Sequence, residues 1–207
     1  MKRQPLQAVL VVAGELASLT AQVTDFSMAN VVSGALFGDG MAATVLVGPA
    51  HDGTPPDGPN GRRPARIHAV QSVHFPDTLD MMGFTHEEGG LRIFLAPRLP
   101  RFVRDHLPGH VEAFLAEHGL NLGDVRHFLL HPGGRKVIDN LERRLGLSVE
   151  QTALSRRVLR EYGNLSSATV LYILHHFERE ARPQAGEWGL LMAVGPGFSA
   201  EMALLRW

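Results

Sequence analysis

Two polar residues stand where a predicted strand or loop meets a glycine-rich entrance to a helix. His131 directly follows an apolar run, and a Pro-Gly-Gly turn then leads into a predicted helix. Asn164 follows Gly163 and precedes a Leu-Ser-Ser stretch. Ligands of α/β folds favour the ends of strands, and glycines let a ligand approach the backbone closely. These two side chains are therefore the first candidates for chemistry.

The two residue types suit the stabilisation of a negatively charged oxygen. A neutral imidazole and a carboxamide can each donate a hydrogen bond to one oxygen, which makes an oxyanion hole for an enolate or a thioester carbonyl. Such a pair suits decarboxylation of a malonyl thioester, although it supplies no nucleophile. Both residues also have a structural interpretation, His131 as a partly buried histidine and Asn164 as a helix N-cap.

The elements that must position this pair predict an α/β domain with a covered mixed sheet. Strands are expected at 8–13 and 41–47, as apolar runs covered on both faces, and at 67–75, 90–95, 125–130, 187–193 and 198–206. Residues 16–23 are expected to pair beside the first strand. No linker divides the chain, so residues 1–207 form one domain, and residues 48–64, with nine Gly or Pro, form an exposed surface loop.

Helices are predicted at 28–36, 99–118, 135–145, from Ser148 onward, and at 163–179. Pro108 is expected to break the second helix into two pieces. Ser148 and Gln151 have the spacing of a capping box. The third helix is amphipathic, with Val137, Ile138, Leu141 and Leu145 on one side. The last helix is expected to open at Asn164.

Composition excludes several classes of protein. The chain has 207 residues, 44% hydrophobic and 20% charged, with a net charge of -1. This balance is typical of a globular protein and excludes a strongly basic nucleic-acid binder. There is no cysteine, so the chain carries no disulfide, no cysteine-based metal site and no thiol nucleophile. The first apolar run is too short to span a bilayer. We expect a cytoplasmic protein that binds neither nucleic acid nor membrane.

The eleven histidines do not predict a metal site. His106 and His110 are four residues apart, but Pro108 lies between them and spoils a regular helix. His175 and His176 are adjacent and point in different directions on a helix. Structural and catalytic metal sites need three or four ligands. We therefore expect no metal.

Four stretches carry a resemblance that covers residues 7–207. They are ALFGDGMAA (35–43), HPGG (131–134), YGNLSSA (162–168) and EWGLLMAVGPGFSAE (187–201). A single GDG or GPG is a weak signal, whereas the four in this order are a strong one. Together they resemble the C-terminal half of a type III polyketide synthase of the chalcone/stilbene synthase family, nearer to its bacterial members than to its plant members.

The resemblance implies a thiolase-like fold, in which two similar βαβαβ halves form one subunit with the active site between them. It also implies a homodimer and a Cys–His–Asn triad that condenses malonyl-CoA, with decarboxylation, onto an acyl-CoA starter. His131 matches the triad histidine, which helps to keep the cysteine as a thiolate and donates to the thioester oxygen. Asn164 matches the triad asparagine, which donates to the same oxygen. CoA thioesters are substrates, and no cofactor is implied.

The resemblance also implies a substrate-binding role for other residues. Ser166 matches a position that lines the elongation cavity. Gly195-Pro196-Gly197 matches a loop that shapes the floor of the active site. Gly133 and Gly134 belong to the HPGG motif, where they leave room for a ligand.

The chain departs from the plant pattern at the cavity. Ala21 and Ile93 stand where plant members have two bulky gatekeeper phenylalanines, and the plant GFGPG reads AVGPG. A different, roomier cavity is expected, so long fatty acyl starters that give alkylpyrones or alkylresorcinols are at least as plausible as a plant flavonoid starter. The starter, the number of extensions and the cyclisation stay open.

The largest departure is the missing nucleophile. The triad cysteine belongs to the family's N-terminal half, to which nothing in this sequence corresponds. We expect the chain to be inactive alone. Because a sheet normally covered by the other half would expose apolar surface, we expect it to aggregate, to pair with itself or to need a separate N-terminal partner.

Two other interpretations are kept. A ketoacyl-carrier-protein synthase III-like enzyme shares the fold and a His–Asn pair, but its histidine stands in a motif without Pro-Gly-Gly. A non-catalytic or truncated subunit could dimerise with a complete synthase. The absence of cysteine supports that interpretation, while the presence of both His131 and Asn164 speaks against it.

Overall fold

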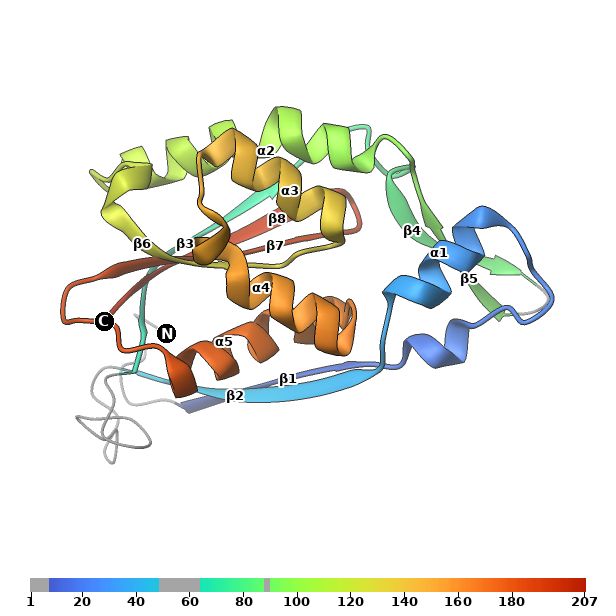
Figure 1. The fold of residues 1–207 in the computed structure, drawn as a ribbon, viewed down its shortest axis with the longest axis horizontal. Helices are drawn as coiled ribbons and strands as arrows, with labels where there is room; N and C mark the ends of the chain where they lie inside the picture. The colour runs from blue at the N-terminus through green and yellow to red at the C-terminus, as the bar shows by residue number, and fades with distance from the viewer. Residues whose placement is uncertain (1–7, 49–63, 88–89) are drawn as a thin grey trace.

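The computed structural model describes residues 8–48, 64–87 and 90–207, so the predicted loop at 48–64 lies almost wholly outside the described residues. A four-stranded sheet is its main element, in the order β3-β8-β7-β6 (Figure 1). The strands are β3 (Arg66–His74), β6 (Val125–Leu130), β7 (Trp188–Gly195) and β8 (Ser199–Arg206). β6 and β7 are parallel and the other two pairs antiparallel, so the predicted mixed sheet is confirmed.

The inner strands of this sheet are covered on both faces, and each face carries its own core. Neighbouring residues of a strand point to opposite sides of the sheet. At the edge strand β3 only one face is covered, since Val70 is 70% exposed. Phe128 and Leu130 of β6 belong to the larger core, which packs against α2 (Leu99–Glu117) and α3 (Arg135–Leu145). Leu129 belongs to the smaller core, which packs against α4 (Val149–Tyr162) and α5 (Thr169–Glu180). The helices therefore form one layer on each side of the sheet (Figure 1).

A second, two-stranded sheet lies on the far side of α5 (Figure 1). It consists of β1 (Ala8–Glu15) and β2 (Gly40–Val47), which pair antiparallel. The prediction that these strands are covered on both faces is wrong for the chain as described. Leu10 is 64% exposed, and Val12 and Val45 are each 59% exposed. The reason is that α5 lies against one face, while no described residue covers the other.

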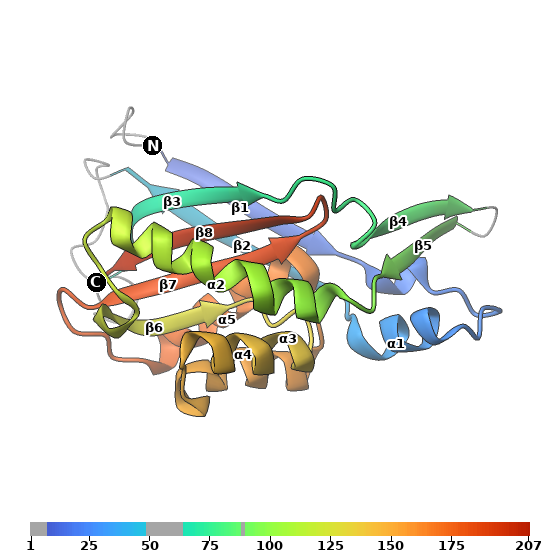
Figure 2. The ribbon, with the colours of Figure 1, turned by 90° about the horizontal axis from the view of Figure 1, so that it is seen from above.

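A smaller lobe lies at one end of the molecule (Figure 2). It contains η1 (Ala17–Thr20), α1 (Met28–Leu36) and a hairpin of β4 (Met82–Glu87) and β5 (Gly90–Leu95). The expected strand at 16–23 is therefore wrong. The Asp39 carboxylate accepts hydrogen bonds from the backbone N–H and the hydroxyl of Ser18, at 2.8 and 2.6 Å. These side-chain contacts favour a turn over a strand.

The helices agree with the prediction except at two places. The buried side of α3 and the capping box of Ser148 and Gln151 are confirmed. Short 3-10 turns, η2 (Leu122–Asp124) and η3 (Ser166–Ala168), precede β6 and α5. α2, however, runs unbroken through Pro108. Leu107 before the proline and Val111 after it are both buried in the core, so packing on both sides outweighs the lost hydrogen bond. The other difference is the last helix, which begins at Thr169 and not at Asn164. Across the described ranges, no helix is long and apolar enough to cross a bilayer.

Candidate active site

His131 is held at the carboxyl end of β6. Its backbone N–H donates to the carbonyl of Met192 on β7 at 2.7 Å, which extends the parallel pairing by one residue. The residue before it, Leu130, donates its N–H to the buried hydroxyl of Ser155 on α4 at 3.3 Å. Ser155 belongs to none of the four motifs. The sequence indicates it only as a polar residue at a buried position of α4. The end of β6 is thus held by hydrogen bonds to β7 and to α4.

The turn after His131 depends on glycine. Gly133 has a φ of 61°, a left-handed conformation that residues with a Cβ rarely adopt. The Gly134 N–H donates to the Pro132 carbonyl at 2.5 Å, and α3 begins at the next residue. This compact turn directs the carbonyl of Gly133 toward the second candidate residue.

Asn164 lies in extended backbone and not in a helix. α4 ends at Tyr162, and Asn164 forms a parallel bridge with Phe37. Its N–H donates to the Leu36 carbonyl at 2.8 Å, and its carbonyl accepts from the N–H of Gly38 at 3.1 Å. The predicted helix opening at Asn164 is wrong, and so is its interpretation as an N-cap, because Ala168 caps α5 without a side-chain hydrogen bond.

Residues 36–38 and residues 162–164 lie so close together that a Cβ would not fit at the glycines between them. A Cβ on Gly38 would lie 2.5 Å from the Tyr162 carbonyl oxygen, and a Cβ on Gly163 would lie 2.9 Å from the Leu36 carbonyl oxygen. Gly163 also has a φ of 77°. The glycines of the two distant motifs, FGDG (37–40) and YGN (162–164), therefore allow the contact that holds Asn164 in place.

The carboxamide of Asn164 is oriented by two hydrogen bonds. Nδ2 donates to the carbonyl oxygen of Gly133 at 2.9 Å, and Oδ1 accepts from the backbone N–H of Ser166 at 2.8 Å. A carboxamide nitrogen carries two N–H groups, so these contacts leave one N–H to donate elsewhere. The contact with Gly133 joins Asn164 to the turn that begins at His131. We call these two residues the His131–Asn164 pair.

His131 is electrically neutral in this environment. Its side chain is 7% exposed, and its Nδ1 is buried without a hydrogen-bond partner among the described residues. Burial lowers the pKa of His131 from 6.5 to about 4, because the charged form loses hydration. At pH 7 the imidazole therefore carries one N–H donor, as an oxyanion hole requires.

Ser166 lies between the pair and α5. It is partly buried and has a φ of 47°, which is uncommon for a residue with a Cβ. Its N–H already holds Asn164. The role of Ser166 in lining a cavity stays a prediction.

The turn Gly195-Pro196-Gly197 lies beyond the same end of the sheet. β7 continues from Met192, the partner of His131, to Gly195. After the turn, buried Phe198 donates its N–H to the Thr78 hydroxyl at 2.8 Å, and that hydroxyl donates to the Phe75 carbonyl at 2.6 Å. Thr78 therefore anchors the turn, a role that the sequence did not indicate. The proposed floor role of the turn stays a prediction.

The remaining predicted cavity residues lie in the smaller lobe. Ala21 is exposed directly after η1, and Ile93 is partly buried on β5. The Gln22 side chain donates to the Leu91 carbonyl at 3.3 Å and so links the two segments. α1 leads from this lobe to the pair, since a Cβ on Gly134 would lie 3.8 Å from the Leu36 side chain. The gatekeeper roles stay predictions.

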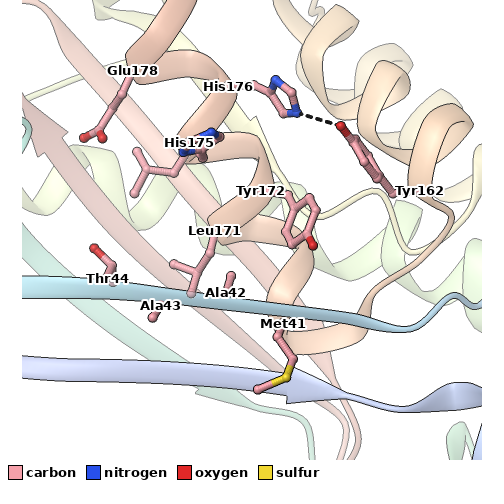
Figure 3. Close-up of a pocket in the computed structure, with 11 residues that line it drawn as sticks. Met41, Ala42, Ala43, Thr44, Tyr162, Leu171, Tyr172, His175, His176 and Glu178 are labelled. Carbon is pink, nitrogen blue, oxygen red and sulfur yellow. Dashed lines mark hydrogen bonds between the residues drawn. The ribbon is translucent and has the colours of Figure 1, made fainter. Parts of the chain in front are cut away.

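A separate open cleft of about 410 Å³ lies between β2 and α5 (Figure 3). Ala42 and Thr44 of β2 face Leu171 and His175 of α5 across it. Burial raises the pKa of Glu178 at its edge. The residues that line the cleft do not include the His131–Asn164 pair. It is a gap between the second sheet and α5 and not the oxyanion site.

The histidines considered for metal binding have other surroundings. His106 and His110 lie against Phe75, with ring centroids 6.4 and 5.2 Å away. His176 accepts or donates a hydrogen bond to Tyr162 at 3.4 Å (Figure 3). Within residues 8–48, 64–87 and 90–207, no group of three metal-ligating side chains is placed to hold an ion.

The fold is that of the C-terminal half of a thiolase-like subunit, and comparison with known proteins agrees. Residues 66–207 match the C-terminal domain of chalcone and stilbene synthases. The chain is 41% identical to 1,3,6,8-tetrahydroxynaphthalene synthase of Streptomyces peucetius subsp. caesius, over 98% of this chain and 52% of that protein. It is 37% identical to a putative chalcone synthase of Bacillus subtilis, over 100% of this chain and 56% of that protein.

A solved structure gives the same result. The crystal structure of 1,3,6,8-tetrahydroxynaphthalene synthase from Streptomyces coelicolor A3(2), a bacterial type III polyketide synthase, superposes with a TM-score of 0.87 at 32% identity. The match covers 99% of this chain and 56% of that one. The chain belongs to the chalcone and stilbene synthase family of type III polyketide synthases. It spans about half the length of the curated relatives it matches.

The glycine contact predicts the effect of a single methyl group. Gly38→Ala places a Cβ against the Tyr162 carbonyl, and we expect a loss of about 1–3 kcal/mol of stability from overpacking. Gly34→Ala, in α1 where a Cβ meets open space, is the control and should be neutral or stabilising by up to about 1 kcal/mol. Urea unfolding measures both. Equal stability of the two variants would contradict the close backbone contact.

The buried imidazole predicts a dependence of stability on pH. The folded-state pKa of His131 is about 4, below its ordinary value of 6.5. Below pH 6.5 the unfolded chain binds a proton that the folded chain excludes, so stability is highest above pH 6.5 and falls toward pH 4, by about 3 kcal/mol. His131→Gln should flatten this fall. The exposed His118→Gln should leave it unchanged, and parallel urea-midpoint curves for both variants would refute the assignment.

Proposed function

We propose that this chain supplies the histidine and asparagine of a type III polyketide synthase, which condenses malonyl-CoA with an acyl-CoA starter. One observation carries the proposal. The Asn164 carboxamide is fixed by the Gly133 carbonyl and the Ser166 N–H, which leaves one N–H to donate, and the Gly133 turn follows the buried, neutral His131. Donors held rigidly in a dry site are the requirement for stabilising an oxyanion.

The chemistry follows from these two donors. When the malonyl thioester loses carbon dioxide, the electron pair of the broken carbon–carbon bond moves onto the thioester oxygen as an enolate. His131 and Asn164 donate hydrogen bonds to that oxygen. The enolate carbon then attacks the carbonyl carbon of the acyl group held on a cysteine, a carbon–carbon bond forms, and the thiolate leaves.

The cysteine must come from a chain segment that matches the other half of the relatives, because this sequence has none. A nearby thiolate would favour the protonated form of His131 and raise its pKa from the low value set by burial. The neutral imidazole of this chain is therefore ready to form a thiolate–imidazolium pair as soon as the cysteine is brought beside it.

The outer face of the β1–β2 sheet is the proposed contact for that half. Leu10 lies opposite Val45, and Val12 lies opposite Ala43. Ala43 points away from α5 (Figure 3), and the alternation of side chains along a strand puts the other three on the same side. All four residues are apolar and exposed. A two-stranded sheet is marginally stable alone, and an exposed apolar patch marks an interaction surface.

The remaining parts of the proposal concern substrates and assembly. Acyl-CoA and malonyl-CoA are the proposed substrates, without a cofactor, and the complete enzyme is proposed to be a cytoplasmic homodimer. The lack of cysteine supports a second candidate, a non-catalytic subunit that binds a complete synthase. The HPGG motif and the family match favour a polyketide synthase over the ketoacyl-carrier-protein synthase alternative.

Reconstitution tests the proposal. The chain is co-expressed with the cysteine-bearing N-terminal half of the Streptomyces peucetius relative and incubated with malonyl-CoA and acyl-CoA starters of several lengths. We expect triketide or tetraketide products by mass spectrometry, and a loss of about 100-fold or more in rate for His131→Ala and for Asn164→Ala. The exposed His118→Ala is the control. Products that persist in both variants would contradict the catalytic proposal, and an inactive complex would favour the non-catalytic subunit.

A further inference from the structure

The carboxylate of Glu15 contacts the segment that carries Asn164, although the two lie far apart in sequence. Glu15 is the last residue of β1 and is partly buried. The Ser167 hydroxyl donates to Glu15 Oε1 at 2.5 Å, and the Ser167 backbone N–H donates to the same oxygen at 3.4 Å. We propose that Glu15 is a positioning residue for the Asn164 carboxamide. This proposal rests on the proposed function of the His131–Asn164 pair.

Ser166, which lies between Asn164 and Ser167, has a backbone conformation that needs support from its neighbours. Ser166 donates its N–H to Asn164 Oδ1, and its φ of 47° lies in the left-handed region that serine seldom adopts. Such a conformation persists only when its surroundings hold it. Asn164 holds one side of Ser166, and Glu15, through Ser167, holds the other. Without Glu15, Ser166 is able to relax and to withdraw its N–H from the carboxamide.

The end of the β1–β2 sheet also contacts the segment at a second point. Glu15 pairs with Gly40, and a Cβ on Gly40 would lie 2.9 Å from the side chain of Leu165. Leu165 is 1% exposed. The end of the β1–β2 sheet therefore contacts the Asn164 segment at two residues, Leu165 and Ser167. Glu15 links the sheet proposed to contact the N-terminal half with the carboxamide proposed to bind the oxyanion.

The carboxamide of glutamine separates positioning from other roles of Glu15. Glu15→Gln keeps an oxygen that accepts both hydrogen bonds from Ser167, whereas Glu15→Ala removes it. In the reconstituted complex we expect Glu15→Ala to lower kcat about ten-fold or more with little change in KM, because the oxyanion donor is displaced while substrate binding is kept. Glu15→Gln should keep at least half of the activity. Glu117→Ala, an exposed carboxylate of α2, is the control.

Hydrogen exchange gives a readout that does not need activity. The Ser166 amide is protected by Asn164 Oδ1, so in the same complex its exchange should be at least ten-fold faster in Glu15→Ala than in Glu15→Gln or Glu117→Ala. An inactive wild-type complex would refute the proposed function, yet this exchange would still decide the role of Glu15. Equal exchange in the Ala and Gln variants, unchanged kcat in Glu15→Ala, or a Gln variant as impaired as the Ala variant would overturn the positioning role.

Discussion

The backbone contact between residues 36–38 and residues 162–164 is the constraint on which the site depends. Two hydrogen bonds join the segments, and glycine at positions 38 and 163 lets them approach within a distance that a Cβ would prevent. The contact holds Asn164 in extended backbone, from which its carboxamide reaches the Gly133 carbonyl. That carbonyl belongs to the glycine-dependent turn that follows His131 at the end of β6. The proposed pair of hydrogen-bond donors is thus positioned by a strand end, one tight turn and one close backbone contact.

The rest of the fold is asymmetric in how it is covered. The main sheet has helices on both faces and a dry core. The β1–β2 sheet has α5 on one face and an exposed apolar surface on the other. The chain spans about half of its relatives, and this exposed surface is the proposed contact for the other half. Glu15 stands at the end of the same sheet, so the proposed docking surface and the proposed oxyanion donor share one structural support.

The sequence predicted most elements and the position of His131 at the end of a strand, because strand periodicity and the motifs are local signals. It failed where distant groups decide. Pro108 stays inside a helix because residues on both sides of it are buried in the core. Asn164 leaves the helix because residues 36–38, more than a hundred positions earlier, bind its backbone. The roles of Ser155 and Thr78 depend on the N–H groups of Leu130 and Phe198, which no local pattern brings to them. The apolar runs of β1 and β2 do form strands, but no described residue covers the outer face of their sheet.

The central claim is that this chain acts by joining a cysteine-bearing half through the outer face of β1 and β2. Sedimentation of the chain mixed with the N-terminal half of the Streptomyces peucetius relative measures that association directly. Val12→Lys places a charge in the proposed contact, while Val70→Lys places one on strand β3, at a position that is also exposed. The account predicts a one-to-one complex, or a dimer of such complexes, that Val12→Lys abolishes and Val70→Lys preserves. A chain that sediments as a monomer beside the N-terminal half, or a complex that tolerates Val12→Lys, would contradict it.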